Sequence, residues 1–168
     1  MKLVRINGGT VMKKIIIVSL LVVLTLSGCK NNSNIRIGDS MSMINNQQTP
    51  FIFLNSLSVF RTNNMYTIVV EKNGEAQNIV EFSSDRKCCT VQGLVLVKDE
   101  DINRYLDKSL NELTEKFGEV HADIGSGFYI PAYITENGYL IYFEVENDVV
   151  YEVMKRDLLT DVIVERLP

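Results

Sequence analysis

Apolar residues recur with helical spacing between Ser109 and Gly118. Leu110, Leu113 and Phe117 fall on one face of a helix with about 3.6 residues per turn. The stretch "SLNE" places a glutamate three residues after a serine, which is the pattern of a capping box that satisfies free backbone N–H groups. Glycine is a common residue just after a helix ends. The pattern therefore predicts one helix over this stretch.

A related pattern lies 69 residues earlier, where Ser40, Met41 and Ile44 repeat the serine and two of the apolar positions. The glutamate of the capping box is missing there, so one of the two reciprocal hydrogen bonds cannot form. We expect a second helix with a weaker cap.

The segment "AYITENGYLIYF" alternates on either side of Asn137-Gly138 and predicts a β-hairpin. Both residue types tolerate the positive φ of a type I′ turn, which suits a two-residue loop. Such a loop pairs Ile134 with Ile141 on a face expected to be core, and Tyr133 with Tyr142 on the other face.

A three-residue loop over residues 146–148 continues this pattern into a third strand. It pairs Phe143 with Tyr151, whereas a two-residue loop would place Glu152 beside Phe143 in the core. We therefore expect the three-residue loop.

An earlier Asn73-Gly74 pair predicts another hairpin within "MYTIVVEKNGEAQNIVEF". Between the two hairpins, "CCTVQGLVLV" is an apolar run that predicts a buried strand, and residues 101–106 have a short helical pattern. The segment "RDLLTDVIVERLP" fits a helix or a strand equally well.

These elements predict an α+β domain over residues 41–168, made of two degenerate helix-plus-antiparallel-hairpin repeats. The first repeat is expected at about residues 38–82 and the second at about residues 107–154. Residues 83–106 are then the connecting segment.

The N-terminal part of the chain has the layout of a secretory signal. Lys13 and Lys14 precede "IIIVSLLVVLTL", an apolar run without charge. A membrane-spanning helix needs about 20 apolar residues, so a cleaved signal is the better interpretation of this shorter run. The first eleven residues do not belong to the layout, and we expect translation to start at Met12.

The signal ends in Leu26, Ser27, Gly28 and Cys29, which resemble the bacterial lipobox of an aliphatic residue, two small residues and a cysteine. The resemblance implies cleavage after residues 1–28 and lipidation of Cys29, with at least two acyl chains such as palmitate. The protein is then anchored in the cell membrane on the extracytoplasmic side, with residues 29–40 as lipidated cysteine and polar linker. An ordinary cysteine behind a cleaved signal is the alternative.

Composition narrows the choice of partners. Four of the 17 basic residues and none of the 21 acidic ones lie in residues 1–28, which leaves a net charge of −8 on residues 29–168. Nucleic acid is a poor partner for such a surface, because phosphate binding depends on clustered Lys and Arg. Membrane attachment is therefore expected through the lipid on Cys29.

No catalytic constellation stands out. The one histidine, His121, is expected in a turn between helix and strand, although it could also mark a flexible loop beside a site. No Gly-x-Ser-x-Gly motif is present, since "IGSGF" around Ser126 is one residue too short. We expect no enzyme activity and no cofactor.

Metal-ligating patterns are equally weak. The acidic run Asp99, Glu100 and Asp101 lacks the glycine and the closing glutamate of a calcium-binding EF-hand, and suits a helix N-terminus better. Cys88 and Cys89 are adjacent and offer no zinc spacing. A disulfide between neighbours would close a very small ring, so we favour thiols there.

A helix followed by antiparallel hairpins, twice over and behind a lipobox, resembles the SmpA/OmlA (outer-membrane assembly) lipoproteins and the beta-lactamase-inhibitor-like domains. The likeness lies in "IRIGDSMSMI" and "SLNELTEKFGEV", each followed by a hairpin. It implies a protein that acts by binding other proteins, since such a fold by itself carries no chemistry.

The outer face of the second hairpin is the candidate contact surface, with Tyr129, Tyr133, Leu140 and Tyr142. An exposed aromatic face is typical of a protein-binding surface, but the chain's own helices or first repeat could equally cover it.

The sequence thus predicts a membrane-anchored protein-binding or assembly module whose protein partner is unknown. The alternative is a small-ligand binder or enzyme with its site in the cleft between the repeats, near His121 and the Gly125-Ser126-Gly127 loop.

Overall fold

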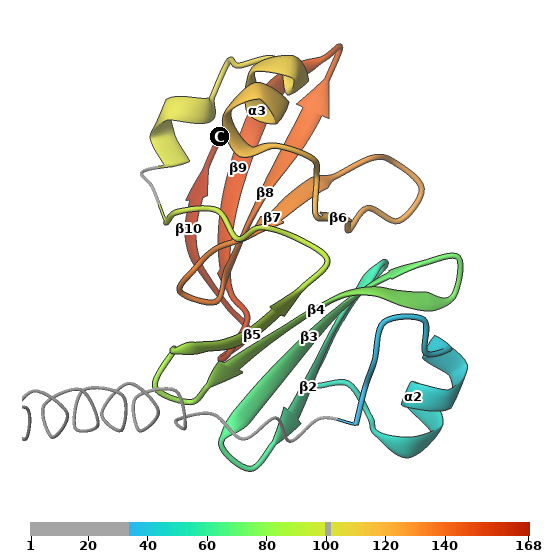
Figure 1. The fold of residues 1–168 in the computed structure, drawn as a ribbon. Helices are drawn as coiled ribbons and strands as arrows, with labels where there is room; N and C mark the ends of the chain where they lie inside the picture. The colour runs from blue at the N-terminus through green and yellow to red at the C-terminus, as the bar shows by residue number, and fades with distance from the viewer. Residues whose placement is uncertain (1–33, 100–101) are drawn as a thin grey trace, which may run out of the picture. The chain divides into compact units, whose positions relative to one another are not determined.

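Two antiparallel five-stranded sheets dominate the computed structural model, which describes residues 34–99 and 102–168 (Figure 1). Strands that follow one another in the chain are neighbours in each sheet. The fold is therefore α+β with a majority of strand. The first sheet contains β1 (Ile52–Leu54), β2 (Leu57–Thr62), β3 (Met65–Lys72), β4 (Glu75–Ser83) and β5 (Cys88–Gln92). The second contains β6 (Ala122–Asp123), β7 (Pro131–Ile134), β8 (Tyr139–Glu146), β9 (Val149–Asp157) and β10 (Val162–Leu167).

Short helices precede both sheets in the chain, and the two predicted helices are confirmed. The capping box of the second is complete, because Ser109 Oγ accepts the Glu112 N–H at 3.2 Å and Glu112 Oε2 accepts the Ser109 N–H at 2.9 Å. Ser40 occupies the N-cap of the first helix but makes no side-chain capping bond. Within residues 34–99 and 102–168, the helical elements are α2 (Met41–Gln47), the 3₁₀ helix η1 (Ile102–Tyr105) and α3 (Leu110–Phe117).

Buried side chains in the described ranges gather in three apolar clusters. The first draws on both sheets, with Leu57 from β2 and Leu140 from β8 among its members. The second cluster lies on the face of the second sheet that is turned away from the first cluster. It joins this face to η1 and α3, and it includes Leu113. The third joins the first sheet to α2 through Met41 and Ile44. The second sheet is therefore buried on both faces, where simple alternation of apolar and polar residues is not expected.

The hairpin at Asn73-Gly74 is confirmed as a two-residue loop. Both residues have positive φ, 57° and 80°, as a type I′ turn requires. Lys72 pairs with Glu75 across the loop.

The predicted loop at Asn137-Gly138 is wrong by one residue. Thr135 N–H donates to the Tyr139 carbonyl at 2.9 Å, which leaves three residues in the loop, and only Gly138 has positive φ. Because side chains alternate along a strand, the shift places Tyr133 opposite Ile141 and separates it from Tyr142. The two tyrosines consequently belong to different apolar clusters.

The predicted three-residue loop at residues 146–148 is also wrong. Asn147 and Asp148 form a two-residue loop, both with positive φ. A β-bulge between Glu144 and Val145 then shifts the register, so that Phe143 pairs with Val153. The bulge leaves one residue of β9 without a partner on β8, so Glu152 pairs with Glu144 and not with Phe143.

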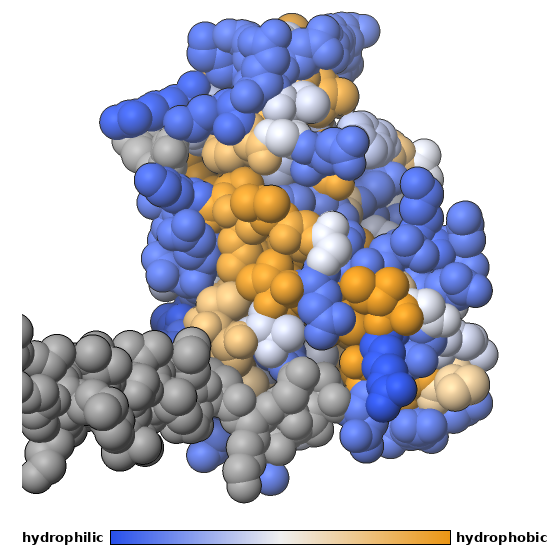
Figure 2. Space-filling model, in the orientation of Figure 1, coloured by the Kyte–Doolittle hydropathy of each residue, from blue (hydrophilic) through white to orange (hydrophobic). Residues whose placement is uncertain are grey.

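The run "CCTVQGLVLV" does not form a buried strand. Only its first half is a strand, β5, which lies at the edge of the first sheet with Cys88 and Val91 exposed. The second half of the run, residues 93–97, crosses the face of the molecule that is seen in Figure 1. Figure 2, in the same orientation, shows apolar side chains gathered where this segment runs. Val95 is 82% exposed. The first sheet thus includes β5, which lies in the predicted connecting segment. The C-terminal segment, which fitted a helix or a strand equally well, forms the strand β10.

The predicted signal, the lipobox, Met12, Glu100 and Asp101 lie outside the described residues. The polar linker was predicted to reach residue 40, but Ile35 is buried in the cluster under α2. Among the residues that the structure describes, no helix is long and apolar enough to cross a bilayer.

Candidate functional site

A cleft of about 740 Å³ lies where the two sheets meet. The first sheet contributes the β1–β2 and β3–β4 turns and their neighbours, and the second contributes the segment from α3 to β6. Amide and carboxylate side chains predominate over apolar ones. The lining residues are Asn55, Ser56, Val70, Glu71, Lys72, Asn73, Gln77, Asn78, Gly93, Glu119, Val120, His121, Ala122, Asp123 and Tyr129.

Hydrogen bonds to Asp123 join the two walls of the cleft. The Asp123 carbonyl accepts the Ser56 Oγ–H at 2.6 Å and the Asn55 Nδ2–H at 3.1 Å. Glu71 N–H donates to the Ser56 carbonyl at 2.8 Å, which ties the same turn to β3. Ser56 and Asn55 are 67 and 68 residues away from Asp123 in the sequence, so only the folded chain brings the two walls together.

A second link between the sheets lies at the β4–β5 turn. The Arg86 guanidinium forms an ion pair with the buried Asp157 and donates from Nη1 to the Asn137 carbonyl at 3.4 Å. It also lies over the Tyr139 ring, 4.9 Å from its centroid. Because an ion pair with a buried carboxylate is screened less than an exposed one, this link supports the packing of the sheets.

The loop from Ile124 to Ile130, called the aromatic loop below, borders the cleft. Asp123 Oδ1 accepts the N–H groups of Gly125 and Ile130, both at 3.0 Å, and closes the base of the loop. A side chain at Gly125 would place a Cβ atom 1.7 Å from a backbone carbonyl oxygen, so only glycine fits there. The aromatic loop is thus a fixed structure.

Two consecutive aromatic residues project from the aromatic loop. Phe128 is 64% exposed and Tyr129 is 47% exposed, and Tyr129 also lines the cleft. Burial of the rest of the side chain and the nearby negative charge of Asp123 raise the pKa of the Tyr129 hydroxyl. Exposed aromatic pairs on a fixed loop are typical anchors in protein interfaces.

His121 lies in the turn between α3 and β6, as predicted, and its side chain is buried. Its Nδ1 accepts the Ile134 N–H at 2.9 Å. Burial lowers the pKa of His121 to about 4, against a hydrogen bond with the backbone of Val95 that raises it. The imidazole is therefore neutral at pH 7 and serves as a hydrogen-bonding bridge inside the protein.

The predicted contact face of the second hairpin is wrong in three of its four residues. Tyr133, Leu140 and Tyr142 are buried, the first in the cluster under α3 and the other two between the sheets. Tyr129 alone is exposed. Two aromatic residues directly after a glycine-rich stretch are a local signal for the aromatic loop, whereas no local signal points to the contact between Asp123 and Ser56.

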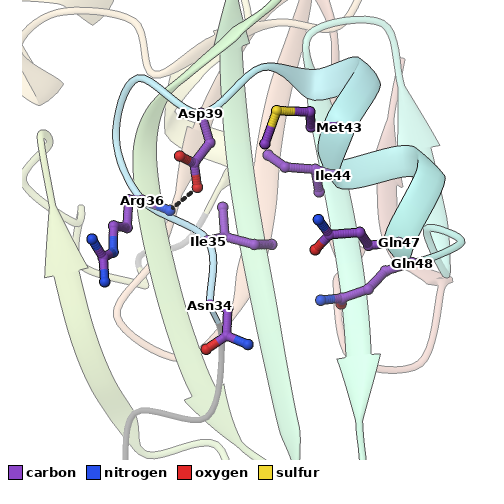
Figure 3. A pocket seen from close by; sticks show the side chains of 8 residues that line it. All are labelled: Asn34, Ile35, Arg36, Asp39, Met43, Ile44, Gln47 and Gln48. Carbon is purple, nitrogen blue, oxygen red and sulfur yellow. Dashed lines mark hydrogen bonds between the residues drawn. The ribbon is translucent and has the colours of Figure 1, made fainter.

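A smaller cavity of about 430 Å³ lies between α2 and the segment that leads into it (Figure 3). Ile35 and Ile44 are its buried residues, and the amides of Gln47 and Gln48 lie on the α2 side. Asp39 Oδ2 accepts the Arg36 N–H at 2.7 Å and shapes the entering segment. This cavity was not predicted from the sequence.

The remaining candidate groups are paired or isolated. Asp99 forms an ion pair with Lys155, and Cys88 is a free, exposed thiol, so no disulfide joins it to its neighbour. Over residues 34–99 and 102–168, no group of three His, Cys, Asp or Glu side chains is arranged to hold a metal ion.

Comparisons with known proteins give no match to a family model, a curated protein or a solved structure.

Proposed function

We propose that this protein is a lipid-anchored extracytoplasmic lipoprotein that acts as a protein-binding or assembly module. The lipobox sequence supports the anchor, and the aromatic loop supports the binding role. Phe128 and Tyr129 are held outward by a loop whose base is closed by two hydrogen bonds to one carboxylate. Exposed apolar area is costly, so a fixed aromatic pair at the surface favours a contact function.

The two halves of the domain are proposed to be degenerate repeats, as in the SmpA/OmlA and beta-lactamase-inhibitor-like proteins that the sequence resembles. Each half contains a short helix that is followed in the chain by five antiparallel strands. This order supports a duplicated unit, and the SmpA/OmlA resemblance in turn favours assembly with other proteins.

Binding without catalysis is part of the proposal. The one histidine is engaged at Nδ1 by the Ile134 N–H and is neutral, so it supports the structure and does not serve as an exposed proton carrier.

Lipidation is tested by Cys29→Ala, which we expect to accumulate as an uncleaved precursor without acyl chains, because the modified thiol is required before cleavage. Intact-mass spectrometry of the membrane fraction measures both changes at once. Cys88→Ala removes the exposed free thiol and is the matched control, expected to be cleaved and acylated normally. Normal processing of Cys29→Ala would refute the anchor.

Partner binding is tested by cross-linking on intact cells, followed by quantitative mass spectrometry. The double variant Phe128→Ala, Tyr129→Ala should reduce capture of a stoichiometric partner by at least about tenfold, because each aromatic anchor typically contributes over 1 kcal/mol. Tyr151→Ala is the control, since that tyrosine is also 47% exposed but lies on β9. Equal capture by the wild type and the double variant would exclude the aromatic loop as the contact surface.

A second candidate function is small-ligand binding in the cleft. It is favoured by the volume of about 740 Å³, which lies within the usual range for ligand sites, and by the amide and carboxylate side chains of the lining, which can hydrogen-bond with a ligand.

A further inference from the structure

The lining of the cleft includes both hydrogen-bond donors and hydrogen-bond acceptors. Carboxylate oxygens of Glu71 and Glu119 only accept, the Lys72 ammonium only donates, and the amide of Asn73 does both. Glu119, Lys72 and Asn73 are exposed, so these groups meet the solvent at the mouth of the cleft. Such a mixed lining suits a ligand whose own groups both donate and accept, as hydroxyl groups do.

The charge of the lining argues against anionic ligands. Three carboxylates, Glu71, Glu119 and Asp123, face one ammonium group, Lys72. A phosphate or carboxylate ligand would meet like charge on most sides, and the histidine in the wall is neutral. An anionic ligand is therefore disfavoured, whereas a neutral ligand whose hydroxyl groups donate to the carboxylates is compatible with this lining.

Tyr129 contributes an exposed aromatic side chain to the lining of the cleft. The residue is 47% exposed, and the aromatic loop that carries it is closed at Asp123. An aromatic face beside polar groups is suited to a molecule with apolar C–H faces and polar edges. Sugar rings have this division, with C–H groups on the faces and hydroxyl groups at the rim.

From these features we propose that the cleft binds a neutral oligosaccharide, with one sugar ring stacked on Tyr129 and its hydroxyl groups hydrogen-bonded to the amide and carboxylate side chains. The inference rests on the second candidate function and names the class of ligand for that site. The open, exposed lining suits a segment of a longer glycan better than an enclosed single sugar.

The experiment is saturation-transfer difference NMR on the full-length protein in detergent, with maltotetraose and tetra-N-acetylchitotetraose as separate probes. We expect transfer to be strongest at the C–H protons of one sugar ring with at least one probe. Tyr129→Ala should weaken binding about tenfold, the loss expected for an aromatic contact of this kind. Tyr129→Phe keeps the ring and should bind like the wild type, and Tyr151→Ala should also bind normally.

The proposal would be overturned if no saturation were transferred to either probe at millimolar concentrations. It would also be overturned if Tyr129→Ala bound the probe as well as the wild type does. A thermal-unfolding screen with metabolites and cations separates this outcome from failure of the second candidate function. Suppose that another ligand raises the unfolding temperature of the wild type and of the control Glu115→Gln on α3, but not that of Glu119→Gln. That result would support the cleft as a ligand site and reject the oligosaccharide as its ligand. No stabilisation and no transfer would reject both.

Discussion

Replacement of Tyr133 by alanine is expected to destabilise the domain by about 3–5 kcal/mol, the usual loss for a large aromatic side chain removed from a core. Tyr133 is fully buried, with ring centroids 5.0 Å from Phe117 and 6.1 Å from Phe143. Its hydroxyl donates to the Gly118 carbonyl at 3.4 Å. Because a domain is stabilised by only about 5–15 kcal/mol in total, the variant should be close to unfolding at 37 °C.

Urea unfolding followed by circular dichroism measures this loss. Tyr133→Phe keeps the ring and removes only the hydrogen bonds of the hydroxyl, with the Gly118 carbonyl and with the Thr114 side chain, and should cost about 1 kcal/mol. Tyr151→Ala, at an exposed tyrosine, should change the free energy of unfolding by no more than about 0.5 kcal/mol. An unchanged unfolding midpoint for Tyr133→Ala would instead place this residue on an exposed contact face, as the sequence pattern alone suggested.

Acidification is expected to destabilise the protein through His121. Burial lowers its pKa from 6.5 to about 4, so below pH 6.5 the unfolded chain binds a proton that the folded chain excludes. Stability from this residue is fully present above pH 6.5 and is lost as the pH falls towards 4. The loss reaches about 3 kcal/mol at the acid end, of which about 2 kcal/mol appears between pH 7 and pH 5.

The comparison protein for this measurement is His121→Gln. Glutamine keeps an oxygen that can accept the Ile134 N–H but has no titrating group, so its stability should fall much less between pH 7 and pH 5. Urea unfolding at a series of pH values gives both curves. Carboxylate groups titrate mainly below this window and act in both proteins alike. Parallel curves for the wild type and His121→Gln would contradict a buried, neutral histidine.

The candidate site could be foreseen only in part. The sequence places a possible cleft near His121 and the Gly125-Ser126-Gly127 stretch, and the structure finds His121 in the cleft lining, whereas Tyr129, which also lines the cleft, is predicted from sequence only as part of a contact face. The link between Asp123 and Ser56 could not be identified, since the Asp123 carbonyl meets the Ser56 hydroxyl of the other sheet only in the folded chain. Groups brought together from 67 residues apart leave no pattern in a single sequence.

The elements that the sequence determined are those fixed by neighbouring residues. The capping box at Ser109, the end of α3 at Gly118 and the two-residue turn at Asn73-Gly74 all depend on backbone preferences over a few positions. Such preferences act before any tertiary contact forms, and the structure keeps them unchanged.

The register of the second sheet was decided by tertiary packing. The loop at Gly138 packs against the β9–β10 turn, where the Leu158 N–H donates to the Gly138 carbonyl at 3.1 Å and a side chain at Gly138 would lie 2.7 Å from Leu159. These contacts accompany a three-residue loop in place of the type I′ turn that Asn137-Gly138 favours. That choice sends Tyr133 towards α3 and Tyr142 towards the first sheet. When both faces of a sheet are buried, either register hides apolar side chains, and only the shapes of the neighbouring layers distinguish them.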